Sequence, residues 1–266
     1  MNRIACAFED LKRKRKKALS VFLTAGYPSL AVTEQLILAL SDCGVDFFEI
    51  GFPFSDPIAD GPTIQKSSEA ALINGITWKK VMRLGQSIRK KSQVPLILMS
   101  YANPLFTRGW RQSAVDLSRA GFDGVIIPDL VPEEGIEVRS IFGNRGLALI
   151  YLVAPTSPLS RIKKIAKASS GFLYCVSVTG VTGARKSLPL SPIQSFLKQV
   201  RQSSSGPLLL GFGISKPSHI HDLGKNVDGF IIASALLNAM EGKKGPTALI
   251  QSAKNFMIPF AKAISK

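Results

Sequence analysis

Short apolar runs recur along the chain, and segments long enough for a helix separate them. Eight runs rich in β-branched residues and bounded by Gly, Pro or Asp are expected strands, at 20–24, 46–51, 94–100, 124–127, 147–153, 172–177, 207–211 and 229–233. Helical periodicity predicts helices at 31–43, 77–91, 109–119, 132–142, 159–168, 191–202 and 217–223. Near-continuous apolar strands that alternate with helices favour a parallel sheet covered on both faces.

The number of these units fits one closed architecture. Eight strand–helix units in 266 residues have the count and size of a (β/α)8 TIM barrel. No linker or shift in composition divides the chain, so we expect a single domain over residues 1–266. An open, doubly wound sheet of eight strands is the alternative that the pattern alone leaves open.

The charge balance suggests a nucleic-acid partner, but the rest of the composition does not. Lys and Arg number 34 against 18 Asp and Glu, a formal net charge of +16. Hydrophobic residues make up 45% of the chain and charged residues only 20%, which indicates a sizeable core. The lysines lack interleaved aromatic residues and no recognition motif accompanies them, so no nucleic-acid partner is expected. Without a long apolar run or a secretory signal, we expect no membrane association and a cytoplasmic protein.

The segment after the second expected strand is the first candidate for chemistry, because active sites of such barrels lie at the carboxyl ends of the strands. Residues 49–62 contain three prolines and three carboxylates, Glu49, Asp56 and Asp60. Glu49 lies within an apolar run, so its side chain is expected inside the barrel, where desolvation raises a carboxyl pKa toward acid–base use. The alternative roles are structural: Glu49 could cap a neighbouring strand, and the two aspartates could form turns.

Glycine-rich loops after the last three expected strands indicate a phosphate site. Gly211-Phe212-Gly213 ends one strand, Ala233-Ser234 follows the next, and residues 179–184 form a third loop of small residues. Glycine lets backbone N–H groups approach phosphate oxygens, although simple tight turns would need the same residues. No metal site is expected, because the cysteines are far apart and the two histidines, His219 and His221, are expected on the surface.

Taken together, the motifs resemble the tryptophan synthase alpha chain family. Residues 49–65, EIGFPFSDPIADGPTIQ, are similar to the family signature, and the likeness continues in order through residues 22–26, 101–104, 128–130, 177–183 and 211–215. It covers nearly the whole chain. The resemblance implies the (β/α)8 barrel and the retro-aldol cleavage of indole-3-glycerol phosphate to indole and glyceraldehyde 3-phosphate. It also implies a partner beta chain, which holds pyridoxal phosphate and condenses the indole with serine, and no cofactor in this chain.

The resemblance assigns roles to individual residues. It makes Glu49 the general acid/base, Asp60 the acceptor of the indole N–H, and Tyr174 a residue that orients Glu49. The implied substrate-binding residues are Phe22, Tyr101 and Phe212 around the indole, Gly183, Gly213, Ala233 and Ser234 around the phosphate, and Thr182, which would contact Asp60 in a closed state. The implied surface for the beta chain, in an alpha2beta2 complex, comprises Pro53, Asp56, Asn103, Phe106 and Pro132.

Two positions depart from the family pattern. Ala233 stands where the family usually has Gly, and its methyl group is expected to crowd or shift the phosphate. Tyr27 stands where many members have Asp.

An alternative to an active lyase subunit is an alpha-like scaffold of low activity that serves mainly to activate a beta subunit. The presence of both Glu49 and Asp60 favours the enzyme.

Overall fold

The computed structural model describes residues 2–177 and 188–265 of the chain. The strands are β1 (Ala18–Thr24), β2 (Phe47–Gly51), β3 (Leu96–Met99), β4 (Gly124–Ile126), β5 (Ala148–Ile150), β6 (Leu152–Val153), β7 (Leu173–Val176), β8 (Leu208–Gly211) and β9 (Gly229–Ile232). The helices are α1 (Arg3–Arg13), α2 (Leu30–Ser41), α3 (Pro62–Ile73), α4 (Trp78–Arg89), α5 (Ala102–Arg108), α6 (Trp110–Ala120), α7 (Ile136–Gly143), α8 (Leu159–Ala168), α9 (Leu190–Ser203), α10 (Ser218–Leu223), α11 (Ser234–Met240) and α12 (Pro246–Ile264), with a 3-10 turn, η1 (Gly224–Asn226).

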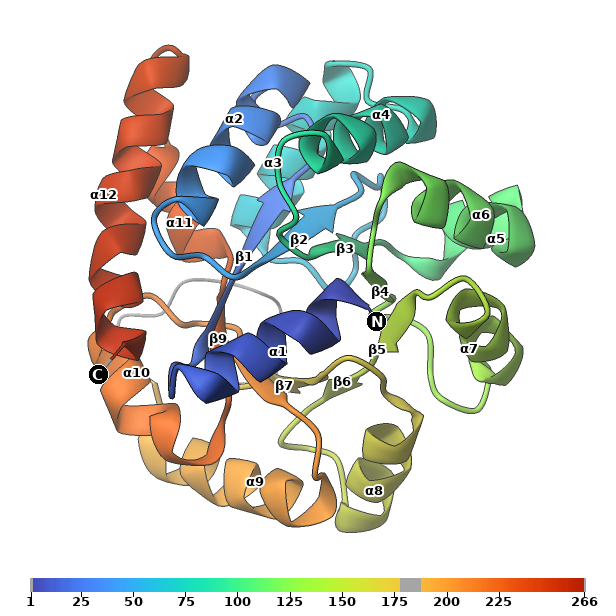
Figure 1. Cartoon of the computed structure of the whole chain (residues 1–266), viewed down its shortest axis with the longest axis vertical. Coiled ribbons are helices and arrows are strands. Elements are labelled where there is room, and N and C mark those ends of the chain that lie inside the picture. The colour runs from blue at the N-terminus through green and yellow to red at the C-terminus, as the bar shows by residue number, and fades with distance from the viewer. Residues whose placement is uncertain (1, 178–187, 266) are drawn as a thin grey trace.

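The strands form one parallel sheet that closes on itself. Their order is β5-β4-β3-β2-β1-β9-β8-β7-β6, and every pairing is parallel. Only Tyr151 separates β5 from β6, the two ends of this order, so the sheet is a barrel and not an open doubly wound sheet. Helices surround the strands on the outside (Figure 1). This confirms the predicted (β/α)8 barrel; the domain bounds of 1–266 stay a prediction, because residues 1 and 266 are not described.

The fifth predicted strand, 147–153, is split into β5 and β6, which is why nine strands occupy eight barrel positions. β5 pairs with β4, whereas β6 pairs with β7. Because β7 begins only at Leu173, serine hydroxyls serve as the partners of the backbone before it: Leu149 N donates to Ser170 Oγ at 2.8 Å and Tyr151 N to Ser169 Oγ at 3.0 Å.

Alternate residues of each strand face inward and outward, which gives the molecule two cores. The inward set forms a cluster inside the barrel that includes Phe47, Ile97, Ile126, Leu209 and Ile231. The outward set packs beneath the helices in the larger cluster. Each strand therefore contributes both to the barrel interior and to the layer below the helices.

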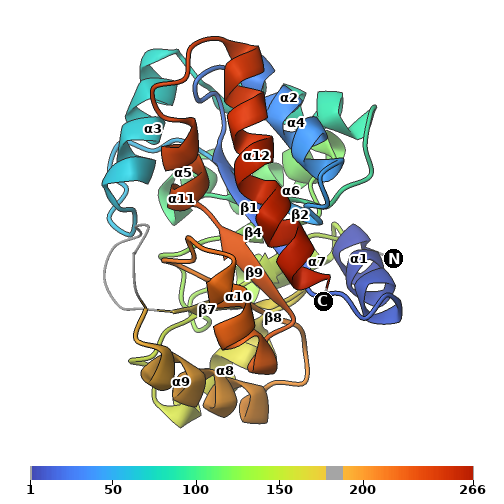
Figure 2. The same ribbon diagram turned by 90° about the vertical axis from the view of Figure 1, so that its left-hand side faces the viewer.

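Helix α1, which the sequence analysis did not predict, closes the amino-terminal end of the barrel (Figures 1 and 2). Its Ile4 and Leu11 are buried with the interior cluster, and the Phe8 ring lies 4.8 Å from that of Phe47. Arg3 pairs with Asp123 at 2.9 Å. The opposite, carboxyl end of the strands is left for the loops that carry the candidate residues.

Candidate active site

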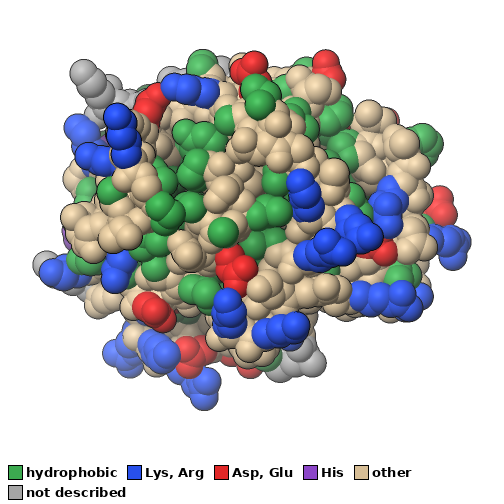
Figure 3. All heavy atoms as spheres, turned by 90° about the horizontal axis from the view of Figure 1, so that it is seen from above, with side chains coloured by type: hydrophobic (Ala, Val, Ile, Leu, Met, Phe, Trp, Pro, Cys, Tyr) green, Lys and Arg blue, Asp and Glu red, His purple; other side chains and the backbone are tan. Residues whose placement is uncertain are grey.

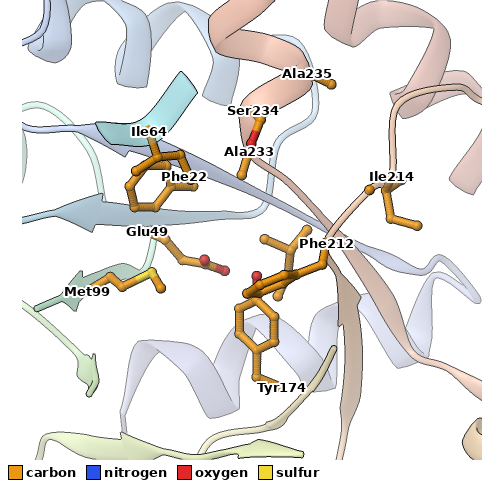
Figure 4. Close-up of a pocket in the computed structure, with 12 residues that line it drawn as sticks. Phe22, Glu49, Ile64, Met99, Tyr174, Phe212, Ile214, Ala233, Ser234 and Ala235 are labelled. Carbon is orange, nitrogen blue, oxygen red and sulfur yellow. The ribbon is translucent and has the colours of Figure 1, made fainter. Parts of the chain in front are cut away.

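A pocket lies at the carboxyl ends of the strands (Figure 4). It lies where the barrel architecture predicts an active site. Its lining comprises Phe22, Glu49, Ile64, Met99, Tyr174, Phe212, Gly213, Ile214, Ile231, Ala233, Ser234 and Ala235. Seven of the residues predicted from the sequence are thus brought together from β1, β2, β7 and the segments after β8 and β9: Phe22, Glu49, Tyr174, Phe212, Gly213, Ala233 and Ser234.

Glu49 is fully buried in the interior of the barrel, as predicted from its place in an apolar run. Its Oε1 accepts a hydrogen bond from Ser20 Oγ at 2.8 Å, whereas Oε2 has no hydrogen-bond partner among the described residues. Burial raises the pKa of Glu49 to about 8, against a smaller lowering by the Ser20 hydroxyl. Glu49 is therefore a neutral acid at pH 7, with one oxygen held and one available to a ligand.

Tyr174 faces Glu49 across the pocket, and the two polar ends point toward one another (Figure 4). Burial, with smaller contributions from Glu49 and Asp60, holds the pKa of Tyr174 well above its usual value. The Tyr174 ring packs edge-on against Phe212, with 5.9 Å between centroids. The phenol is therefore neutral and can exchange a hydrogen bond without taking a proton from Glu49.

Two strand glycines make room for the aromatic lining. A Cβ at Gly51 would overlap the Phe22 ring, and a Cβ at Gly211 would overlap the Tyr174 hydroxyl end. Any side chain at these positions would displace a wall of the pocket. The glycine that ends β2 and the one that ends β8 thus shape the site by leaving room for the aromatic rings.

Asp60 lines an adjoining pocket with Tyr101, and Phe22 and Met99 line both pockets. Burial raises the pKa of Asp60 to about 6, against a lowering by its hydrogen bond with the Tyr101 side chain. The Tyr101 hydroxyl also accepts a hydrogen bond from Ala59 N at 2.9 Å. This bond holds the loop that contains Asp60 against Tyr101, two residues after the end of β3. Asp60 is therefore mainly ionised at pH 7, whereas Glu49 is mainly protonated.

The expected phosphate residues are only partly described. Phe212 and Gly213 both have positive φ, 64° and 76°, so the chain turns sharply after β8, and the Ser177 hydroxyl donates to the Phe212 carbonyl. Ala233 has a φ of −124° and a ψ of −100° and precedes Ser234, the first residue of α11. Thr182 and Gly183, with the whole of the loop 179–184, lie outside the described residues.

The residues expected to meet a partner chain lie in the segments after β2, β3 and β4, with Asn103 and Phe106 in helix α5. Asp56, Asn103 and Phe106 are exposed, Pro132 is half-buried, and Pro53 is buried and offers little surface. Further large apolar side chains are exposed at Ile58, Val131, Ile136 and Leu159, which also follow the carboxyl ends of strands. This surface, Asp56, Ile58, Asn103, Phe106, Val131, Ile136 and Leu159, is called the rim below.

One expectation about the histidines is wrong. His221 is exposed as predicted, but His219 is buried, because α10 packs it inward where its Nδ1 accepts from Ser215 N at 3.4 Å. Within residues 2–177 and 188–265, no three His, Cys, Asp or Glu side chains are grouped so that they could hold a metal ion. In the same part of the chain, no helix combines the length and the apolar character needed to cross a membrane.

Sequence reasoning missed several residues of the site. Met99 and Ile64 line the pocket. Among the described residues, Ser20 forms the hydrogen bond with Glu49. Ser20 lies on β1 two residues before Phe22, so the two side chains point to the same side of the strand. The alternation of β1 therefore contained the signal that Ser20 faces the barrel interior.

Comparison with known proteins agrees with this geometry. The family model of the tryptophan synthase alpha chain matches residues 8–265. The alpha chain of Geotalea daltonii is 46% identical over 92% of both chains, and that of Caldanaerobacter subterraneus subsp. tengcongensis is 41% identical over 99% of this chain and 100% of its own.

Solved structures agree as well. Tryptophan synthase subunit alpha from Legionella pneumophila superposes with a TM-score of 0.90 at 36% identity, covering 99% of this chain and 98% of that one. A chain of Mycobacterium tuberculosis tryptophan synthase gives 0.90 at 30% identity, covering 100% and 99%. The chain therefore belongs to the tryptophan synthase alpha chain family.

Proposed function

We propose that this chain cleaves indole-3-glycerol phosphate in the pocket between β1, β2, β7 and β8, with Glu49 as the general acid/base. The chain is an alpha subunit of tryptophan synthase, a lyase, and this cleavage is the reaction of its family. The observation that carries the residue assignment is the Glu49 carboxyl: it is buried, has a raised pKa and faces an apolar, aromatic pocket with one free oxygen.

The reaction needs two proton movements at the bond that breaks. Glu49 donates its proton to indole C3, which makes the ring an iminium-like cation and weakens the bond from C3 to the glycerol side chain. The resulting carboxylate then accepts the proton of the C3′ hydroxyl as that bond breaks and the aldehyde forms. Indole and glyceraldehyde 3-phosphate leave, and Glu49 is again protonated.

Asp60 stabilises the charge that develops on the indole. As a carboxylate it accepts the indole N–H and lowers the energy of the protonated ring. Phe22, Tyr101 and Phe212 provide apolar contact area for the ring, and the neutral Tyr174 hydroxyl orients the Glu49 carboxyl. Two nearby carboxyl groups with different pKa values are typical of sites in which one acts as acid and the other as anion.

The phosphate is assigned to Gly213, Ala233 and Ser234, together with Gly183. The support is that the first three line the end of the pocket where the chain turns sharply after β8. Thr182 is assigned to contact Asp60 when the loops 56–60 and 179–184 close over the substrate. The Ala233 methyl group is expected to shift the phosphate and to leave its site in place.

The rim is assigned to the beta chain, in an alpha2beta2 complex. Its exposed apolar side chains follow the carboxyl ends of strands, the end of the barrel at which the pocket lies, so a partner that covers them could receive indole directly. The cleavage needs only proton transfers, so we assign no cofactor to this chain and place pyridoxal phosphate in the beta chain. We place the complex in the cytoplasm.

A coupled assay tests this function. The purified chain is incubated with indole-3-glycerol phosphate, alone and with its beta chain, and the indole and tryptophan formed are measured. We expect slow release of indole by the chain alone and faster turnover with the beta chain. No cleavage in either condition would contradict the proposal, and activation of the beta chain without cleavage would favour the scaffold.

A further inference from the structure

Ser20 is the side chain that touches Glu49 from below, on the side away from the mouth of the barrel. In the register of β1 and β2, Phe22 lies opposite Glu49 and Ser20 lies opposite Phe47. Ser20 therefore belongs to the layer of inward side chains nearer the amino ends of the strands. Both Ser20 and Glu49 are fully buried, and 2.8 Å separates Ser20 Oγ from Glu49 Oε1.

The direction of this hydrogen bond follows from the partners that are present. A serine hydroxyl has one proton to donate, and no other acceptor for the Ser20 proton is found among the described residues. Ser20 therefore donates to Oε1, and the proton of the neutral carboxyl resides on Oε2.

We propose that Ser20 is a positioning residue that holds Oε1 of Glu49 and so directs Oε2, with its proton, into the substrate pocket. Oε2 is the oxygen without a partner among the described residues. Without Ser20, the carboxyl could rotate and carry its proton on either oxygen. This inference deepens the proposed function and rests on it only where turnover is measured.

The surroundings of Glu49 allow the effect of Ser20 to be measured by titration. Among the described residues that line the same pocket, Tyr174 and Ser234 are the polar ones besides Glu49, and Tyr174 stays neutral because its pKa is raised. Asp60, in the adjoining pocket, has a pKa of about 6, below that of Glu49. A hydrogen bond that stabilises the carboxylate lowers its pKa, so loss of the Ser20 hydroxyl is expected to raise the pKa of Glu49.

The variants Ser20→Thr and Ser20→Val form a matched pair, because the two side chains have the same size and only Thr retains the hydroxyl. Ser20→Ala removes the hydroxyl without adding bulk, should the larger side chains perturb the barrel. Ser113→Ala is the control: Ser113 is equally buried, but its hydroxyl donates to the Leu105 carbonyl on the outside of the barrel.

The first test needs no turnover. The pKa of Glu49 is measured by NMR in protein labelled with 13C at the glutamate carboxyls, and the signal is assigned by its absence in Glu49→Gln. We expect the pKa to rise in Ser20→Val and Ser20→Ala by up to about 1 unit and to stay near that of the wild type in Ser20→Thr and Ser113→Ala. Equal pKa values in the Val and Thr variants would overturn the proposal.

The second test uses the kinetics of cleavage. Ser20→Val is expected to lower kcat by about tenfold with little change in KM and to move the basic limb of the pH profile upward, while Ser20→Thr restores both. Equal losses in Thr and Val would show that bulk, not the hydroxyl, matters and would overturn the proposal. If the wild type itself releases no indole, the proposed function fails, whereas the titration still decides the role of Ser20.

Discussion

The two carboxyl residues of the site have opposite protonation states at neutral pH. Burial raises the pKa of both residues. Among the described residues, a hydrogen bond with Tyr101 opposes this rise at Asp60, and a hydrogen bond from Ser20 opposes it at Glu49. The difference gives a window, between about pH 6 and about pH 8, in which Glu49 holds a proton and Asp60 holds a charge. The assigned roles require this combination.

The window predicts the pH dependence of catalysis. We expect kcat/KM for indole-3-glycerol phosphate to rise as Asp60 ionises near pH 6 and to fall as Glu49 ionises near pH 8. The measurement is the initial rate of indole release from pH 5 to 9.5. Asp60→Asn should remove the acidic limb from the profile that remains; an unchanged acidic limb in this variant would contradict the assignment.

The buried Glu49 also predicts how stability depends on pH. Because its pKa in the folded chain is about 8, above the usual 4.5, its contribution to stability is fully present below pH 4.5 and is lost as the pH rises through 8. The free energy of unfolding of Glu49→Gln, relative to the wild type, should therefore increase by on the order of 4 kcal/mol between pH 4.5 and pH 9. Urea denaturation at several pH values measures this difference, and a constant difference would contradict the raised pKa.

At the residue scale, the reactive carboxyl residues could be predicted from the sequence, whereas the residue that positions Glu49 could not. Glu49 and Asp60 lie in a segment whose prolines, glycines and carboxylates indicate a shaped loop. Ser20 lies inside an apolar run, which was interpreted only as a strand. Which buried atoms it meets depends on the register of β1 against β2, and no local pattern specifies that register.

At the scale of elements, the strands were predicted within about two residues, because apolar runs bounded by turn residues are a strong signal. The helices α1, α3, α5, α11 and α12 were not among the predicted ranges. For α1 a signal was present, since Ile4, Phe8 and Leu11 have helical spacing and the Asn2 side chain caps Ile4 N. The break at Tyr151 had no local signal, because it depends on the hydroxyls of Ser169 and Ser170 farther along the chain.

Helix α1 contributes to stability but lies at the end of the barrel away from the chemistry. Ile4→Ala, which empties a fully buried site, is expected to lower the free energy of unfolding by about 2–5 kcal/mol and to leave KM unchanged. Chemical denaturation and steady-state kinetics measure the two effects. The control is Ile73→Ala, at an exposed position, with an expected effect within about 0.5 kcal/mol. Equal effects of the two substitutions would show that α1 does not close the core.

At the scale of the whole molecule, the barrel has two unlike ends. One is covered by α1, and the other has the pocket and the rim. Basic side chains are spread over the face shown in Figure 3, with acidic ones between them, on a chain whose net charge is +16. The charge that suggests a nucleic-acid partner in the sequence is, on that face, part of the surface of an enzyme for a small anionic substrate.

Because the rim lies outside the pocket, we expect substitutions in it to weaken binding of the beta chain without changing the cleavage reaction. The Phe106 side chain is 66% exposed, and its ring packs edge-on against Trp110, with 6.0 Å between the ring centroids. Phe106→Ser is expected to weaken binding of the beta chain by about tenfold or more, as loss of an aromatic anchor does, without changing kcat/KM of the chain alone. Calorimetry measures the binding, with Ile73→Ser as the matched exposed control. A Kd that changes equally in both variants would contradict the assignment of the rim.

The central claim, that the Glu49 carboxyl transfers the protons of the cleavage, is tested most directly by single-turnover cleavage in Glu49→Gln. Excess enzyme is mixed with indole-3-glycerol phosphate, and indole and glyceraldehyde 3-phosphate are measured together. The account predicts equal amounts of both products from the wild type and none above background from the variant, which still folds and binds the beta chain. Cleavage by Glu49→Gln at the wild-type rate would contradict it.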